Sequence, residues 1–303
     1  MILTHKEFEN LLNFRFSEKM KQVIDSLKIE LQPLSDEDFQ QKVENIESVL
    51  NTPNIIAAGS HRIDDWNNGW DENNIEFAKS GNVDSLIPKY FGKYKTVRFD
   101  DKFYNILNKD CEINMLRVLQ YFILEKYCKN FNNFYEFGCG TGHNLFAISE
   151  FEKDKNFFGF DWSNPPREIF QNIQKFYNRN FIFDNFDFEK PNHNVNIENN
   201  SVVFTFAALE QIGDRHDKFV QFLLEKKPSL CIHLEPISEI LDNNEKLQSL
   251  SIRYINKRNY LSNFCSSLKK LQKDNRIDII DVARTTIGSY FLEGYSLVVW
   301  RVK

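Results

Sequence analysis

Three glycines within five positions, Gly138, Gly140 and Gly142, are the residues of this sequence best suited to bring a ligand against the backbone. They stand in the segment FYEFGCGTGHNL, which follows a short apolar run and precedes an apolar helical pattern. Because glycine has no side chain to keep a bound group away, such a loop can approach a ligand closely. The loop could serve a phosphate, a dinucleotide, another nucleoside cofactor, or only a tight turn.

The spacing of the glycines separates these alternatives. A phosphate-binding P-loop carries a Lys and a Ser or Thr after its last glycine, whereas His143 and Asn144 follow here. A dinucleotide fingerprint, GxGxxG, has its third glycine five positions after the first, and in this chain that position is His143. The spacing is GxGxG, which disfavours both a phosphate-binding P-loop and a dinucleotide-binding loop.

Acidic residues flank the loop in a pattern that resembles a known family. Glu136 precedes the loop, and Asp161 ends the next apolar run. Asp187 and the segment ALEQIG then follow in order. This ordered set resembles the motifs of the class I S-adenosylmethionine-dependent methyltransferases. The resemblance covers residues 111–303 and implies S-adenosyl-L-methionine as cofactor and S-adenosyl-L-homocysteine as product.

The resemblance also implies roles for individual positions. Asp161 would accept hydrogen bonds from both ribose hydroxyls, as a carboxylate does in Rossmann-like folds. Asp187, beside Phe188, would bind the adenine amino group, and Trp162 would either flank the adenine or simply pack. Two alternatives stay open: Asp161 could cap the following helix, and Asp187 could be a solvated loop carboxylate. The predicted cofactor-binding residues are Glu136, Gly138, Cys139, Gly140, Thr141, Gly142, Asn144, Asp161, Trp162, Asp187, Phe188 and Phe206.

Candidates for the acceptor chemistry lie at the carboxyl ends of predicted strands, where open α/β sheets bind ligands. The segment FTFAALEQIGD resembles the family segment near the transferable methyl group, but Gln211 stands where that family usually has a His. An O-methyltransferase needs a base to take the hydroxyl proton. We predict Glu210, Glu235 and His233 as catalytic candidates. His233 could instead be satisfied inside its strand, and Glu210 could brace the helix that follows.

Aromatic and polar residues gather in the segment AGSHRIDDWNNGWDE, which contains His61, Arg62, Trp66 and Trp70. Such a mixture is typical of sites for polyhydroxylated ligands, and we predict these four residues as substrate-binding. An ordinary insert with two core tryptophans explains the segment equally well. Arg258, in RYINKRNYL, could contact an anionic acceptor or lie on a solvated helix face. We find no metal-ligand set and predict no metal.

These residues require a framework of alternating strands and helices. Apolar runs predict strands at 133–137, 156–161, 181–186, 201–206 and 229–234, with helices between them. This alternation predicts parallel strands joined by right-handed crossovers. The runs RIDIIDVARTT and YSLVVWRVK predict an antiparallel hairpin. The expected fold class is α/β: a Rossmann-like seven-stranded mixed sheet, parallel with a C-terminal antiparallel hairpin, flanked by helices.

Residues 1–110 are predicted to form a mainly helical N-terminal cap or lid with a substrate-facing insert. Residues 1–50 fit two or three helices, and Ser35 followed by Asp38 is close to a capping box. Residues 51–105 are predicted to be irregular, and a buried helix is expected at 111–130. The methyltransferase domain would span residues 111–303, with an insert at about 236–275.

The composition disfavours several classes of protein. The chain has 303 residues and a formal net charge of −5, which argues against a dominant nucleic-acid surface. Its five cysteines form no CxxC pair and are expected to be reduced thiols. The sequence shows neither a membrane span nor a secretory signal, so we expect a cytoplasmic protein, as a monomer or homodimer.

These observations together predict a methyltransferase that acts on a small acceptor. The first expectation is O-methylation of a sugar, nucleotide-sugar or glycan hydroxyl in surface-polysaccharide or natural-product biosynthesis. A small-molecule N-methyltransferase is the alternative within the same class. A non-catalytic S-adenosylmethionine-binding scaffold or regulatory protein is the alternative from another class.

Overall fold

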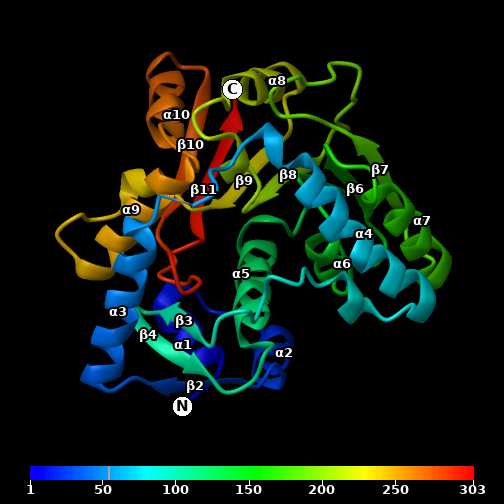
Figure 1. The fold of residues 1–303 in the computed structure, drawn as a ribbon. Coiled ribbons are helices and arrows are strands. Elements are labelled where there is room, and N and C mark those ends of the chain that lie inside the picture. The colour runs from blue at the N-terminus through cyan, green and yellow to red at the C-terminus, as the bar shows by residue number, and fades with distance from the viewer. Residues whose placement is uncertain (54) are drawn as a thin grey trace.

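A seven-stranded sheet forms the centre of the protein, as Figure 1 shows. The computed structural model describes residues 1–53 and 55–303; residue 54, within the segment expected to be irregular, lies outside the described residues. The strand order is β10-β11-β9-β8-β5-β6-β7. The strands are β5 (Asn133–Phe137), β6 (Asn156–Asp161), β7 (Phe181–Asn185), β8 (Ser201–Phe206), β9 (Leu230–Glu235), β10 (Ile277–Ala283) and β11 (Ser296–Val302).

The pairing of these strands confirms the expected fold class. Strands β5 to β9 pair parallel with one another, and β11 pairs antiparallel with both β9 and β10. The order reverses at β5, because β6 continues on one side of it and β8 on the other. Ligands bind at such a reversal, outside the carboxyl ends of the strands.

Side chains on the strands alternate between two apolar layers. In β5, Phe134 belongs to one buried cluster, whereas Tyr135 and Phe137 belong to the other. The first layer is covered by α5 (Cys111–Tyr127), α6 (His143–Ser149) and α7 (Pro166–Tyr177). The second is covered by α8 (Asp217–Lys226) and α10 (Phe264–Lys273). Helix α5 confirms the expectation of a helix buried on more than one side.

The N-terminal part contains a sheet that the sequence analysis did not predict. Its order is β1-β2-β4-β3, built from β1 (Ile2–Leu3), β2 (Ile29–Pro33), β3 (Thr96–Phe99) and β4 (Lys102–Ile106). Asp100 and Asp101 join β3 to β4 with φ of 51° and 57°. Two central residues with positive φ are the mark of a type I′ hairpin turn. The expectation of an irregular segment at 51–105 is therefore wrong for this hairpin.

The N-terminal part also contains the helices α1 (His5–Leu12), α2 (Glu18–Ser26), α3 (Asp36–Asn51) and α4 (Ile63–Ser80). The expected cap at Ser35 is confirmed, because its side chain accepts from the Asp38 amide at 3.1 Å. Helix α4 also falls in the segment expected to be irregular, so that expectation is wrong there as well. Helix α3 packs against α9 (Lys246–Arg258) through Val43, Ile46 and Leu250.

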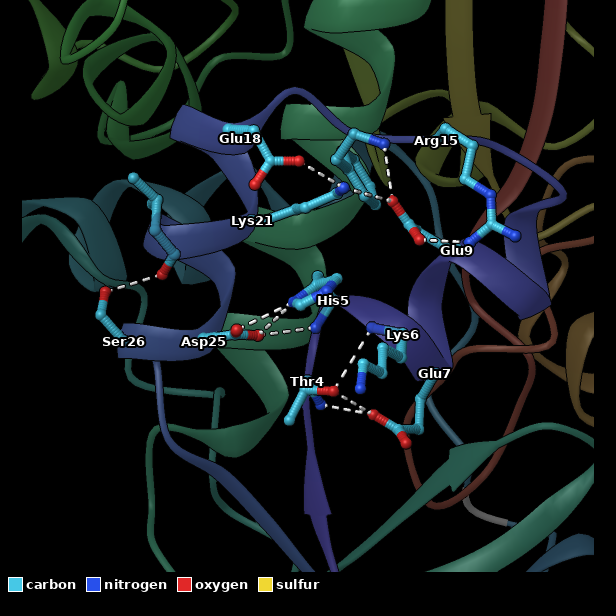
Figure 2. Close-up of polar contacts among 12 residues, drawn as sticks. Thr4, His5, Lys6, Glu7, Glu9, Arg15, Glu18, Lys21, Asp25 and Ser26 are labelled. Carbon is cyan, nitrogen blue, oxygen red and sulfur yellow. Dashed lines mark hydrogen bonds and ion pairs between the residues drawn. The ribbon is translucent and has the colours of Figure 1, made fainter.

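Polar contacts fix the first two helices, as Figure 2 shows. Thr4 and Glu7 form a complete capping box at the start of α1. His5 and Asp25 join α1 to α2, with Nδ1 and Oδ2 at 2.8 Å. Glu9 is buried and accepts from Arg15 Nη1 at 2.5 Å. Side-chain hydrogen bonds, as well as apolar packing, therefore fix the positions of α1 and α2.

Helix α4 lies against α7 although the two are far apart in sequence (Figure 1). The Asn74 Nδ2 donates to Glu168 Oε2 at 2.8 Å, and the Asn67 Oδ1 accepts from the Asn164 amide at 3.1 Å. Tyr177 donates its hydroxyl to the Gly81 carbonyl at 2.6 Å. These bonds hold α4 against α7 and the residues just before it.

The buried cluster on the α5 side of the large sheet runs without a break into the N-terminal part. It contains Phe8 of α1 and Leu31 of β2 together with Phe134 and Phe204 of the large sheet. The boundary predicted at residue 110 therefore does not separate two apolar cores. Among the described residues, no helix is long and apolar enough to cross a membrane.

Candidate functional site

A cavity of about 540 Å³ lies at the carboxyl edge of the large sheet. It is lined by residues that follow four adjacent strands: the glycine loop after β5, Asp161 and Trp162 at the end of β6, Asp187 after β7, and Gln211 after β8. Small-molecule sites have volumes of roughly 300 to 1,000 Å³. Both the size and the position at the strand-order reversal fit a binding site for a small molecule.

The glycine loop is shaped by contacts within the protein. Gly138 and Gly140 have φ of 76° and 49°, which L side chains rarely adopt. A Cβ on Gly138 would stand 2.3 Å from the Ala208 Cβ, and one on Gly140 would stand 2.8 Å from the Trp70 ring. The sequence alone predicts that the glycines serve the close approach of a ligand. In the structure, the side chains of Ala208 and Trp70 leave no room for a Cβ at Gly138 and Gly140, so glycine is needed there even without a ligand.

Asp161 links the glycine loop to the end of β6. Its Oδ2 accepts from the Gly140 amide at 2.9 Å, and its Oδ1 accepts from the amide and hydroxyl of Ser163 at 2.9 and 2.5 Å. Burial raises the pKa of this carboxyl, against the opposing effect of these hydrogen bonds. Asp161 also lines the cavity, so a ligand there would meet a carboxylate held in one orientation.

Glu136 is fully buried and contacts Asn144, which lines the cavity. The Asn144 Nδ2 donates to Glu136 Oε1 at 2.7 Å, and the Gln120 Nε2 donates to Asn144 Oδ1 at 2.6 Å. The other carboxyl oxygen, Oε2, is buried without a partner. Burial, together with the nearby Asp161, raises the pKa of Glu136 to about 8. Glu136 is therefore placed to act on the cavity through Asn144.

Most of the other predicted cofactor residues lie where the sequence analysis places them. Cys139, Trp162, Asp187, Phe188 and Phe206 line the cavity. The Asp187 Oδ1 accepts from the Glu189 amide at 2.8 Å, which holds the turn after β7.

Besides Glu136, two other predicted cofactor residues do not line the cavity. Thr141 donates its hydroxyl to the Leu86 carbonyl at 2.5 Å, which ties the loop to the segment after α4. Gly142 is the N-cap residue of α6. The contacts of both residues are structural.

Helix α4 contributes Trp66 and Trp70 to the cavity wall. Their rings stack with centroids 5.3 Å apart, and Trp70 covers Gly140. The Trp66 Nε1 is buried without a hydrogen-bond partner. Arg62 lies over the Trp66 ring at 5.4 Å and pairs with Asp65, so it supports the wall without lining it.

Two other predicted substrate residues do not line the cavity. His61 is exposed. Arg258 lies over the Tyr260 ring at 5.1 Å, and its Nε is buried without a partner. Neither residue lines the cavity, so this geometry does not support direct contact with a ligand there.

Two of the three predicted catalytic residues have structural contacts instead. The Glu235 carboxyl accepts from the amides of Ala208 and Leu209 at 3.0 and 3.1 Å, and from that of Glu210 at 3.3 Å. His233 shares a hydrogen bond of 2.9 Å with the Thr205 hydroxyl inside the sheet, and burial lowers its pKa to about 3. Neither lines the cavity, and these contacts do not support the expected roles.

The third predicted catalytic residue, Glu210, contacts a residue of the cavity wall. The Gln211 Nε2 donates to Glu210 Oε1 at 2.9 Å, and Gln211 lines the cavity. Burial, with a smaller effect of the nearby Glu235, raises the pKa of Glu210 to about 8. Glu210 itself does not line the cavity, so its effect on a ligand would pass through Gln211.

Some wall residues were not among the predicted site residues. Tyr90, from the segment between α4 and β3, had no local motif that could have identified it. His143 directly follows the glycine loop, and Asn185 lies near the end of the strand predicted at 181–186, so the strand-end rule points to both. Burial lowers the pKa of His143 to about 3, which leaves its ring neutral.

Four residues at or beside the cavity hold a buried polar atom that has no hydrogen-bond partner. They are Trp66 Nε1, Glu136 Oε2, His143 Nε2 and Gln211 Oε1. An unpartnered buried polar group costs about 1 to 3 kcal/mol, so such a cluster favours a polar ligand. Among the residues described, no group of three or more His, Cys, Asp or Glu side chains is arranged to hold a metal ion.

No protein-family model and no curated protein matches the sequence. Solved structures match in arrangement. An O-methyltransferase family protein from Burkholderia thailandensis is 11% identical with a TM-score of 0.47, over 63% of this chain and 57% of that one. Human N-acetylserotonin methyltransferase, in complex with SAM, is 12% identical with a TM-score of 0.41, over 64% and 56%. The [4+2]-cyclase SpnF is 12% identical with a TM-score of 0.45, over 61% and 80%.

These similarities concern the fold. The matched part spans 57% and 56% of the two methyltransferases, and all three TM-scores are below 0.5. The three proteins also differ in what they do, since one is a cyclase. The activity of the present chain must therefore be argued from its own cavity.

Proposed function

We propose that this chain is a class I S-adenosylmethionine-dependent methyltransferase that methylates a small acceptor. The observation that carries the proposal is the meeting of the GxGxG loop, Asp161 and Asp187 around one cavity at the reversal of strand order. The cavity volume and the cluster of unpartnered polar atoms support a polar ligand of cofactor size.

The proposed cofactor contacts are the predicted residues that line this cavity. S-adenosylmethionine, when bound, supplies an electrophilic methyl group on its sulfonium. In the proposal, Asp161 accepts hydrogen bonds from the ribose hydroxyls as well as from the Gly140 amide. Asp187 accepts a hydrogen bond from the adenine amino group, and Phe188 packs against the adenine ring. Trp66 and Trp70 exclude water from the loop. The contact residues proposed are Gly138, Cys139, Gly140, Asn144, Asp161, Trp162, Asp187, Phe188 and Phe206.

For the acceptor, we propose a small molecule with a hydroxyl group, and a sugar or nucleotide sugar as the first class to screen. The aromatic wall formed by Trp66, Trp70 and Tyr90 supports this choice, because aromatic faces pack against sugar rings. N-methylation of a small amine is the second candidate. It is favoured by Gln211, whose neutral amide can orient an acceptor but cannot take a proton.

Calorimetric titration with S-adenosylmethionine, S-adenosylhomocysteine and NAD tests the cofactor. We expect micromolar binding of the two sulfur nucleosides and none of NAD. Asp161→Ala should lose this binding by about tenfold or more, because it removes the carboxylate proposed for the ribose. Asp154→Ala, at an exposed position before β6, is the matched control and should bind as the wild type does.

The outcomes separate clearly. Tight binding of NAD without the sulfur nucleosides would overturn the proposal. Wild-type affinity in Asp161→Ala would leave the cofactor but remove Asp161 from the site. If binding is established, the two acceptor classes are distinguished by screening hydroxyl and amine compounds for methylated product.

A further inference from the structure

Gln211 lies at one end of the cavity. The sheet order β8-β5-β6-β7 puts the residues after β8 and those after β7 at opposite ends of the same edge. Asp161 and Asp187, the proposed nucleoside contacts, follow β6 and β7. Gln211, in the short 3-10 turn Leu209–Ile212, follows β8. The transferred methyl group and the acceptor therefore belong at the Gln211 end.

The Gln211 amide is held by one contact and lacks another. Its Nε2 donates to Glu210 Oε1 at 2.9 Å. Its Oε1 is buried and has no partner. An amide oxygen has two acceptor sites, and leaving both empty in a buried place is costly. Because the amide nitrogen can only donate, its contact with Glu210 Oε1 leaves the amide oxygen of Gln211 as the free end.

The turn that carries this amide is itself held in place. The Glu235 carboxyl at the end of β9 accepts the amides of Ala208, Leu209 and Glu210. These three hydrogen bonds fix the backbone from Ala208, which lines the cavity, to Glu210, which directly precedes Gln211. Such a support limits how far the Gln211 side chain can move from the cavity wall.

We propose that Gln211 is the residue that orients the acceptor group, by accepting a hydrogen bond from its O–H or N–H at Oε1, and that Glu210 is a positioning residue that fixes the amide. This inference rests on the proposed function. It restricts the acceptor to groups with a hydrogen to donate, hydroxyls and amines, and disfavours carbon or thioether acceptors. Gln211 takes no proton itself, since an amide oxygen is too weak a base.

The test uses sinefungin, an analogue of S-adenosylmethionine in which a carbon bearing an amine replaces the sulfur bearing the methyl group, so that the amine stands where the methyl group would be. S-adenosylhomocysteine has the sulfur but neither the methyl group nor this amine. Calorimetry of the wild type should give sinefungin an affinity about tenfold above that of S-adenosylhomocysteine, because the amine donates to Gln211 Oε1. The sinefungin ratio is the affinity for sinefungin divided by the affinity for S-adenosylhomocysteine. In Gln211→Met, which keeps the size of the side chain and removes the amide, this ratio should fall to about one while the affinity for S-adenosylhomocysteine stays unchanged.

Further variants keep the result interpretable. Gln211→Glu should raise the sinefungin ratio above that of the wild type, because a carboxylate pairs with the ammonium; this readout stands even if Gln211→Met fails to fold. Glu210→Gln should lower the ratio, because the amide can then turn. Gln171→Met, exposed on α7, is the matched control and should keep the wild-type ratio.

The failures are distinguishable. If the wild type binds none of the nucleosides, the proposed function is wrong and this inference falls with it. If S-adenosylhomocysteine binds but sinefungin has no advantage, or if Gln211→Met keeps the advantage, only the role of Gln211 is overturned.

Discussion

Glu136 shows how the fold changes the chemistry of a single residue. Its carboxyl is fully buried, accepts a hydrogen bond from Asn144 at Oε1, and has no hydrogen-bond partner at Oε2. Burial is the main reason that its pKa rises to about 8 from the ordinary 4.5. The folded protein therefore holds a proton on Glu136 over a pH range in which the unfolded chain has lost it.

This proton makes stability depend on pH with a definite sign. The stabilisation is complete below the unfolded pKa and is lost as the pH rises through the folded pKa of about 8. Glu136→Gln keeps the neutral form at every pH. We predict that the melting temperature of the wild type falls between about pH 5 and pH 8, and that it falls less in Glu136→Gln.

Scanning calorimetry at several pH values checks this prediction. Glu112 and Glu210, whose pKa values burial raises to about 7 and about 8, act in the same direction, so part of the wild-type dependence should remain. Glu37→Gln, exposed on α3, is the control and should follow the wild type. An identical pH dependence in Glu136→Gln and the wild type would contradict the prediction.

At the scale of elements, Arg98 joins three segments that are distant in sequence. It lies in β3, and its backbone pairs with Gly288 in the loop between β10 and β11. Its Nη1 donates to the Leu247 carbonyl at 2.6 Å and to the Ser251 hydroxyl at 2.8 Å, both in α9. Its Nη2 donates to the Phe291 carbonyl at 3.0 Å. One buried cation thus ties the small sheet to α9 and to the loop between β10 and β11.

Replacing this side chain should be costly. Arg98→Met fills similar space but leaves several buried acceptors without their charged donor. We predict a loss of about 3 kcal/mol in the free energy of unfolding, measured by urea denaturation. Arg301→Met removes an exposed arginine paired with Asp278 and should change stability by less than about 1 kcal/mol. Equal losses in the two variants would argue against the role of Arg98.

The β3–β4 hairpin is also marked by local signals in the sequence, although a hairpin is not among the elements predicted there. TVRF and KFYNI are short β-rich runs on either side of Asp100 and Asp101. Two Asp residues can adopt the left-handed conformation that a two-residue hairpin turn requires. The surrounding Gly, Pro and Asn residues favoured an irregular segment, and their density concealed this pattern.

On the scale of the whole molecule, one apolar core joins the N-terminal part to the large sheet. Phe8 of α1 is fully buried, contacts Phe99 of β3 edge to face at 5.4 Å, and belongs to the same cluster as Phe134. A shared core favours unfolding as one cooperative unit. The N-terminal part should therefore not unfold at a lower denaturant concentration than the sheet.

We predict coincident urea transitions by far-ultraviolet circular dichroism and by tryptophan fluorescence. Phe8→Ala should lower both midpoints together, with a loss of about 3 to 5 kcal/mol, because it leaves a cavity in the shared core. Ile2→Ala, at an exposed position, should change little. Separate transitions, or a shift in only one probe, would show that the N-terminal part folds independently.

The sequence by itself determined the central sheet, the helix at α5 and the grouping of the glycine loop with Asp161 and Asp187. Strand runs, side-chain periodicity and caps such as Ser35 are local properties, and strand ends converge at one edge in any parallel sheet. Only the tertiary structure decided that α4 covers Gly140, that Glu235 holds a turn, and that Glu210 contacts Gln211 of the cavity wall. A buried polar group takes whichever partner the packing brings to it, and those partners come from segments that sequence spacing does not relate.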